Sequence, residues 1–169
     1  MRSALMLAVR WWALAGGVML LVIVAVTSAN VGGFVLDAVA TPWGWDVPGL
    51  PGYEDVVTLA ISAAALMFFP YCQQCRGHVV VALFASRFPV PLRRALDAFW
   101  LAATAGTAAF LAYWMTVGMI ERRQDGALSR VLGVPEWPFF LPGIVSLVLW
   151  GLVATLQIAA DRPGAGGDG

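Results

Sequence analysis

The sequence predicts an all-α integral membrane protein with four transmembrane helices. Of its 169 residues, 60% are hydrophobic and only 12% are charged, and the mean hydropathy is +0.80. A water-soluble domain carries about 25% charged residues, so this chain has too few to cover a surface that faces water. Four apolar stretches also have the length, about 20 residues, that crosses a hydrocarbon layer as a helix. A helix satisfies its own backbone in lipid, so each stretch is a predicted span.

Charged residues bound each predicted span. The first follows Arg10, and the second follows Glu54 and Asp55. The third ends just before Glu121, and the fourth ends just before Asp161. The first span could also be a cleaved signal peptide, with small residues at 26–29, but its apolar run continues past that point. The predicted spans cover residues 11–34, 56–75, 98–120 and 139–160, within a single membrane domain over 1–169.

Arginines are distributed unequally between the two sides of the predicted bundle. The side with both termini carries seven, the opposite side carries three, and the chain contains no lysine. Because basic residues are enriched on the cytoplasmic side, both termini are predicted to be cytoplasmic. The outer loop at 37–53 is rich in Pro and Gly and is predicted to be irregular. Trp11, Trp12 and other tryptophans near span ends are interpreted as anchors in the headgroup zone.

Residues 77–88 predict a short amphipathic helix on the cytoplasmic surface, between the second and third spans. Its valines and phenylalanines share one helical face, and His78 with several small residues lies on the other. The segment is too short to span the membrane, and its arginine favours water. The alternative is that it extends the second span. The glycine-rich tail at 161–169 is predicted to be disordered.

Composition argues against several classes of function. Ten basic and ten acidic residues give a net charge of zero with no basic cluster, which argues against a nucleic-acid partner. Two cysteines cannot form a disulfide framework, and a single histidine excludes bis-histidine haem ligation and most histidine-based metal sites. We therefore expect no cofactor, no metal and no catalytic residue.

Cys72 and Cys75 have the spacing of a dithiol redox motif, so a membrane thiol–quinone oxidoreductase is one alternative function. Such an enzyme works on the oxidising periplasmic side and needs a second cysteine pair to relay electrons. Here the pair lies on the arginine-rich side, and the chain has no other cysteine. A second alternative is a free-standing structural four-helix membrane protein.

Polar residues at the span ends are candidate contacts with a partner or with lipid. Glu54 enters the second span from outside, where a carboxylate is either hydrated or paired. Gln73, Gln74, Arg76 and His78 form a polar cluster at the inner end of that span. The third span is uncharged and has small residues at 102–109, which let membrane helices approach closely. The chain is built to pack against helices and lacks the charged pathway of an ion carrier.

Together, these segments resemble the small permease (Q-type) subunit of tripartite ATP-independent periplasmic (TRAP) transporters. The resemblance extends over about residues 11–160 and includes length, span number and orientation. Its most specific parts are CQQCRGHVVV at 72–81, Phe88 and Pro89, RRALD at 93–97, and VPEW at 134–137 followed by Pro142 and Gly143. Glu54 also stands at a family-like position. The family often has an acid after the valine of the histidine motif, where this chain has Ala82.

The resemblance implies an accessory subunit without catalysis of its own. In this family, a soluble periplasmic protein delivers an organic acid to a large multi-span permease, which carries the substrate and sodium sites and moves by an elevator-type motion. The small subunit would be a static brace for the permease in the bacterial inner membrane. The residues expected to contact the large subunit or lipid are Glu54, Gln73, Gln74, Arg76, His78, Arg87, Arg93, Arg94 and Trp137.

Overall fold

The computed structural model describes residues 2–41, 52–75 and 89–160. They form α1 (Arg2–Ala40), α2 (Tyr53–Met67), α3 (Phe69–Gln74), α5 (Val90–Gln124), the 3₁₀ helix η3 (Trp137–Phe139) and α6 (Phe140–Ala160). Four stretches are long and apolar enough to cross a membrane, namely Ser3–Val39, Tyr53–Gln74, Arg94–Gln124 and Trp137–Ala160. The predicted all-α class with four membrane-spanning helices is confirmed. The predicted surface helix at 77–88 and the predicted disordered tail at 161–169 lie outside the described residues.

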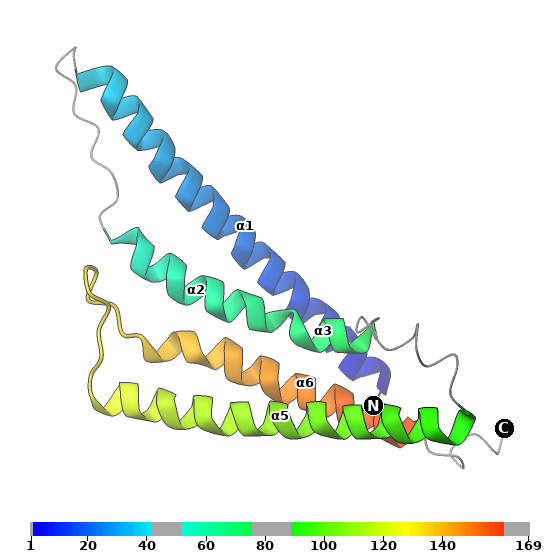
Figure 1. The fold of residues 1–169 in the computed structure, drawn as a ribbon. Helices are drawn as coiled ribbons and strands as arrows, with labels where there is room; N and C mark the ends of the chain where they lie inside the picture. The colour runs from blue at the N-terminus through cyan, green and yellow to red at the C-terminus, as the bar shows by residue number, and fades with distance from the viewer. Residues whose placement is uncertain (1, 42–51, 76–88, 161–169) are drawn as a thin grey trace.

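The helices lie side by side in the order α1, α2 with α3, α6 and α5 (Figure 1). α5 and α6 are antiparallel neighbours joined by a hairpin at 125–136. We call the end that holds the starts of α1 and α5 and the ends of α3 and α6 the termini end. The opposite end, with the 125–136 hairpin, is the hairpin end. α1 lies close to α2 and α3 near the termini end and diverges from them toward the hairpin end (Figure 1).

Two helices continue well beyond the apolar stretches predicted as spans. α1 starts at Arg2 rather than near residue 11, and α5 starts at Val90 rather than near residue 98. Hydropathy marks where lipid ends, whereas a helix continues for as long as its residues favour the helical backbone. The added turns of α5 include RRAL at 93–96, all good helix formers, and Pro91 lies in the first turn, where amide protons need no intrahelical partner.

The second span is broken between α2 and α3 at Phe68. Pro70 has no amide proton, so the Leu66 carbonyl cannot receive the bond that residue 70 donates in a continuous α-helix. The Phe68 amide instead bonds the Ala65 carbonyl, three residues back, at 3.4 Å. Regular spacing resumes where the Cys72 amide bonds the Phe68 carbonyl at 2.9 Å. The short α3 that follows lies against α6.

Small side chains line the contacts between the helices, and most large apolar side chains point outward. The buried residues of α2 and α6 are Ala60, Ala63, Ala64, Met67, Gly143, Ser146, Leu147, Val153 and Ala154. Gly16 of α1 packs so closely on α2 that an added Cβ would lie 2.9 Å from Met67 Cβ. In lipid, where burial of apolar surface brings no gain, such close contact holds helices together.

The small residues at 102–109, expected to pack against helices, do so on one side of α5. Ala108 is buried, and an added Cβ on Gly151 of α6 would lie 3.5 Å from Ala108 Cβ. Four other small residues of the stretch are exposed, namely Ala102, Gly106, Thr107 and Ala109. One side of the stretch therefore forms the contact between α5 and α6, and the other side is free for lipid or a partner.

Candidate functional site

Three polar side chains meet between α3 and α6 near the termini end. Gln73, which is only 4% exposed, donates through Nε2 to Gln157 Oε1 at 2.8 Å. Its Oε1 accepts a hydrogen bond from Trp150 Nε1 at 3.3 Å. Gln157 Nε2 donates in turn to the Gln73 backbone carbonyl at 2.9 Å. The buried amide is thus satisfied through both of its polar atoms, as apolar surroundings require, and it fixes the position of α3 along α6.

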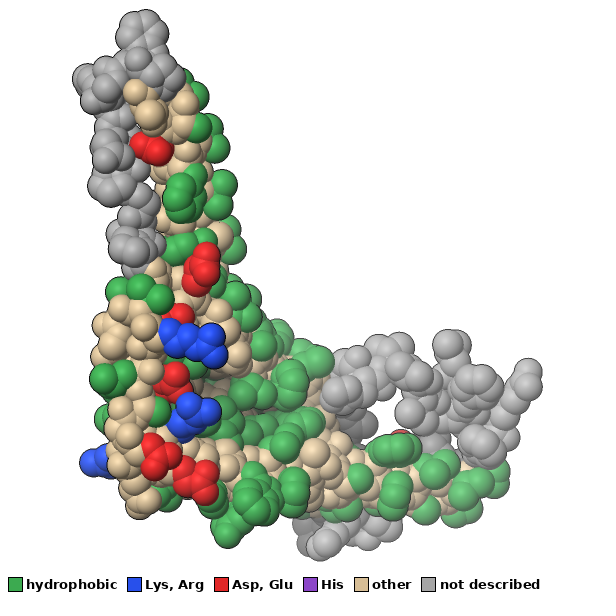
Figure 2. Space-filling model, turned by 60° about the vertical axis from the view of Figure 1, so that its left-hand side comes forward, with side chains coloured by type: hydrophobic (Ala, Val, Ile, Leu, Met, Phe, Trp, Pro, Cys, Tyr) green, Lys and Arg blue, Asp and Glu red, His purple; other side chains and the backbone are tan. Residues whose placement is uncertain are grey.

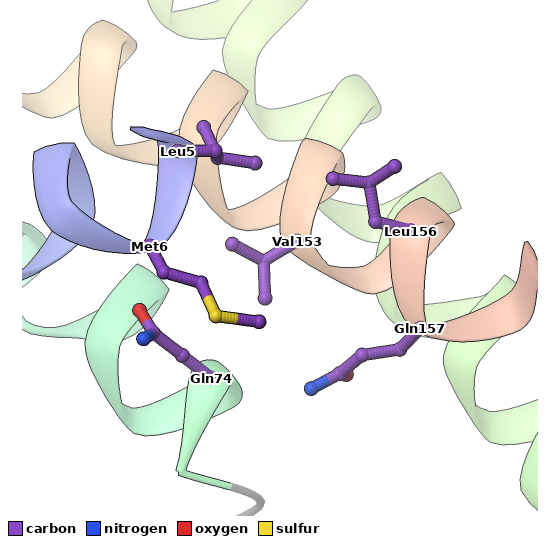
Figure 3. Close-up of a pocket in the computed structure, with 6 residues that line it drawn as sticks. All are labelled: Leu5, Met6, Gln74, Val153, Leu156 and Gln157. Carbon is purple, nitrogen blue, oxygen red and sulfur yellow. The ribbon is translucent and has the colours of Figure 1, made fainter. Parts of the chain in front are cut away.

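Gln74, the next residue, lines a small hollow between α1, α3 and α6. The other lining residues are Leu5, Met6, Val153, Leu156 and Gln157 (Figure 3). Gln74 Oε1 is buried and has no hydrogen-bond partner among the described residues. The hollow has a volume of about 40 Å³, which is room for a few water molecules. The hollow is too small for an organic acid, and the amides of Gln74 and Gln157 are the polar side chains in it that could bond to water.

A hydrogen bond at another place in the bundle connects α1 to α6. Trp12 Nε1 donates to Ser146 Oγ at 2.9 Å, and the fully buried Ser146 hydroxyl donates to the Pro142 carbonyl at 2.6 Å. Trp11, in contrast, is 65% exposed and points outward. The two adjacent tryptophans therefore differ in role, since Trp11 suits the predicted anchor in the headgroup zone and Trp12 joins two helices.

Charged side chains gather at the hairpin end (Figure 2). Arg122 Nη1 pairs with Glu136 Oε2 at 3.0 Å, with the arginine side chain 54% exposed. The Arg123 guanidinium lies 5.2 Å from the centroid of the Trp137 ring, within the range of a cation–π contact. Both contacts join the end of α5 to the residues that lead into α6. Water screens them, so they fix geometry more than they add stability.

Asp55 holds the 125–136 hairpin against the start of α2. Its Oδ2 accepts a hydrogen bond from the Val131 amide at 2.9 Å. Directly before α2, Gly52 has φ +81°, and an added Cβ would lie 2.7 Å from Val131 Cγ1. Only glycine combines this left-handed backbone with so close an approach. The hairpin is therefore fastened to the second span at two adjacent points.

The structure separates the residues that the sequence offered as one set of contacts. Gln73 and Gln74 lie at the termini end, whereas Glu54 and Trp137 lie at the hairpin end. Glu54 is exposed, and no ion pair involves it among the described residues. Arg94 is exposed at the start of α5, and Arg93 precedes it on the same helix. Arg76, His78 and Arg87 lie outside the described residues.

Sequence reasoning missed the partners of these residues. Gln157, Trp150 and Ser146 all lie in the fourth span, and none was singled out as a contact. A signal for Gln157 was present, because it is the one amide side chain of its span and stands near the same end as Gln73. Asp55 was named with Glu54, and its contact with the hairpin was not foreseen.

The described part of the chain was also searched for clusters of metal-ligating side chains and for disulfides. Over residues 2–41, 52–75 and 89–160, no group of three His, Cys, Asp or Glu residues could hold a metal ion. Cys72 and Cys75 are both free and exposed at the end of α3.

Comparison with known proteins decides which protein family this architecture represents. A family model described as tripartite ATP-independent periplasmic transporters, DctQ component, matches residues 45–163. The chain belongs to this DctQ family. The sequence resemblance to the small TRAP permease subunit is thereby confirmed, and the DctQ match includes α2, α3, α5 and α6 with the Gln73, Asp55 and Arg122 contacts. No curated protein and no solved structure matches the chain.

The DctQ assignment makes the chain a small component of a TRAP transporter and a multi-pass membrane protein. It leaves the thiol–quinone oxidoreductase without support, because DctQ proteins are transporter components. α1 precedes the matched region and is joined to it by the Trp12–Ser146 hydrogen bond and the Gly16–Met67 contact.

Proposed function

We propose that this DctQ component is a static brace for the large permease of a sodium-coupled TRAP transporter of organic acids. It lies in the bacterial inner membrane with both termini in the cytoplasm, and a periplasmic binding protein supplies the substrate to the permease. The chain performs no catalysis and does not transport alone. Glu54, Trp137 and the polar residues of the termini end contribute contacts with the large subunit or lipid.

The uncharged interior of all four spans carries this proposal. Residues 11–36, 56–75, 98–120 and 137–160 contain no Asp, Glu, Lys, Arg or His. A carrier of ions or organic acids places ionisable groups at membrane depth to bind and release them. The polar groups that are buried here, such as Gln73 and Ser146, bond to other helices of the same chain. The substrate and sodium sites therefore belong to the partner, and this chain supplies rigid packing.

Affinity purification tests the partnership. The tagged chain is extracted from its native membrane in mild detergent and its companions are identified by mass spectrometry. We expect a large multi-span permease in a one-to-one ratio. Recovery of a stable chain without such a partner contradicts the proposal and favours a free-standing four-helix protein.

Transport assays test the bracing role. In the presence of the periplasmic binding protein, proteoliposomes with the large permease but without this chain should show no sodium-driven uptake of labelled carboxylic acids, and uptake should appear when this chain is added. The variant with Cys72→Ser and Cys75→Ser should restore uptake fully. Loss of uptake in that variant would instead favour a redox role for the two exposed cysteines. Full uptake by the permease alone would rule out a required brace.

A further inference from the structure

The hollow between α1, α3 and α6 lies near the level of charged residues rather than in the middle of the bundle. On α1 its lining residues are Leu5 and Met6, which precede the exposed Arg10 by about 6–8 Å along the helix. On α6 the lining residue Gln157 stands shortly before Asp161 in the sequence. Charged side chains mark the zone of headgroups and water, so water rather than hydrocarbon reaches the hollow.

Two amide side chains at the hollow have hydrogen-bonding capacity that the described protein groups leave unused. Gln74 Oε1 is buried and accepts no hydrogen bond from a described residue. Gln157 Oε1 accepts one bond from Gln73 Nε2, and Gln157 Nε2 donates one to the Gln73 carbonyl. A primary amide has two N–H donors and two lone pairs, so one of each remains on Gln157. Figure 3 shows the Gln74 and Gln157 side chains on either side of the hollow.

The size and the lining of the hollow indicate which ligand it takes. Its volume of about 40 Å³ holds about two or three water molecules at about 10–15 Å³ each. A cavity lined only by apolar side chains stays dry, whereas water enters a cavity that offers it at least two polar partners. The amides of Gln74 and Gln157 supply those partners, and a buried oxygen without a donor is unfavourable.

We propose that this hollow is a hydration site, in which an ordered water molecule donates a hydrogen bond to Gln74 Oε1 and bonds the Gln157 amide. The water joins the last residue of α3 to α6 beside the first turns of α1. Gln73 makes the connection between α3 and α6 directly, and Gln74 makes it through water. A water-mediated bond is nearly as favourable in enthalpy as a direct one, but fixing the water costs entropy. The water therefore sets the geometry of this junction more than it raises the stability of the bundle.

Other occupants fit the hollow less well. A lipid acyl chain offers no donor to Gln74 Oε1, and a hard cation needs more oxygen ligands than two amide side chains supply. A donor side chain of the large permease is the remaining alternative. Measurements on the chain alone and in the complex distinguish that donor from water.

Nuclear magnetic resonance on isotope-labelled methionine methyl groups tests whether water occupies the hollow. The whole chain is placed in nanodiscs of deuterated lipid. The Met6 methyl should show a nuclear Overhauser effect with water, of the sign that marks a long-lived contact. The Met115 methyl, which packs against Gly143 between α5 and α6, is the dry control. Absence of the Met6 signal overturns the inference.

Two substitutions of Gln74 show whether the signal depends on its oxygen. Gln74→Leu removes the acceptor, so the Met6 signal should fall by about fivefold or more. Gln74→Glu keeps an acceptor oxygen and should preserve the signal. Because Met6 is 46% exposed, an unchanged signal in Gln74→Leu would assign it to surface water and overturn the inference. Loss of the wild-type signal on addition of the large permease would assign Gln74 Oε1 to a partner donor and would also overturn it.

Filling the hollow provides an independent test. Val153→Ile adds one methylene group to a buried lining residue and should displace the water. Gln74 Oε1 then lacks a donor, so the equilibrium constant of unfolding should rise by about threefold or more. In the Gln74→Leu background, Val153→Ile should change that constant by less than about twofold. An equal rise in both backgrounds would indicate simple overpacking, and a fall in the wild-type background would indicate an empty hollow, so either result overturns the inference.

Discussion

Gln73 and Gln74 are chemically identical neighbours with very different surroundings. Gln73 bonds Gln157 and Trp150, whereas Gln74 Oε1 is buried without a described partner. The sequence analysis placed both residues in one polar cluster. Sequence shows that an amide side chain lies near the end of a span, but it does not show which residues of the other helices that side chain contacts. Gln73 and Gln157 are separated by 84 positions, and no local pattern links them.

Replacing each glutamine separately should reveal this difference. Gln73→Leu removes the hydrogen bonds to Gln157 Oε1 and Trp150 Nε1, while the bond from Gln157 Nε2 to the backbone carbonyl of residue 73 remains, and it should lower the free energy of unfolding by about 1–2 kcal/mol. Gln74→Leu removes a buried oxygen that bonds no described residue and should change it by less than about 0.5 kcal/mol, or raise it. Reversible unfolding in mixed micelles measures both. Equal losses would mean that Gln74 has a partner as strong as that of Gln73.

Asp55 and Glu54 are a second pair of neighbours with different surroundings, because Asp55 accepts a hydrogen bond from the hairpin and Glu54 is exposed. Asp55→Ala removes the acceptor of the Val131 amide, and exchange of that amide with solvent should accelerate about three- to tenfold. Asp55→Asn keeps an acceptor oxygen, so in this variant the Val131 amide should exchange at nearly the wild-type rate. Glu54→Ala is the matched control for loss of charge in the first turn of α2. Hydrogen exchange with mass spectrometry resolves the three variants, and faster exchange in Glu54→Ala would assign the effect to charge alone.

At the scale of the helix, apolar stretches located the spans well and the helix ends poorly. α1, α2 with α3, α5 and α6 all contain a predicted span, but α1 and α5 continue into charged and polar residues. Lipid selects apolar side chains, and it does not require a helix to stop where they stop. The break at Phe68 follows from Pro70, a residue visible in the sequence whose effect depends on neighbouring helices that accept the altered backbone.

Two adjacent glycines test how α1 and α2 pack. A Cβ on Gly16 would lie 2.9 Å from Met67 Cβ, whereas one on Gly17 would meet nothing within 4 Å. Gly16→Leu should push the helices apart and cost about 1–3 kcal/mol of stability. Gly17→Leu points outward and should change stability by no more than about 0.5 kcal/mol. Unfolding of both variants in the same detergent is the measurement, and an equal cost would place the contact elsewhere on α1.

At the scale of the whole molecule, the charge distribution gives the bundle two unlike ends. The described hairpin end carries six acidic and three basic residues, and seven of the ten arginines lie on the side of the termini in the sequence. The family, the helical class and the number of spans were all predictable from the sequence, because each depends on features spread along the chain. The contacts between spans were not, because four apolar helices can be arranged around one another in several ways with similar hydropathy.

Orientation follows from the same charge asymmetry and can be measured directly. In the Cys72→Ser, Cys75→Ser background, Arg130→Cys of the hairpin should react with a charged maleimide added to intact spheroplasts. Arg94→Cys, exposed at the start of α5, should react only after lysis. The reverse pattern would place both termini in the periplasm and would contradict the proposed topology.

α6 forms side-chain hydrogen bonds with α1 and α3, and an ion pair joins α5 to the segment that leads into α6. Trp12 reaches Ser146, Gln73 reaches Gln157 and Trp150, and Arg122 reaches Glu136 just before η3. α6 leaves the ribosome after the other three described spans. During synthesis the first three described spans enter the membrane without these partners, and these contacts can form only when α6 arrives. A chain that terminates before α6 would thus lack the hydrogen bonds that Gln73 and Trp12 form with that helix, and membrane quality control can recognise such a chain by the missing contacts.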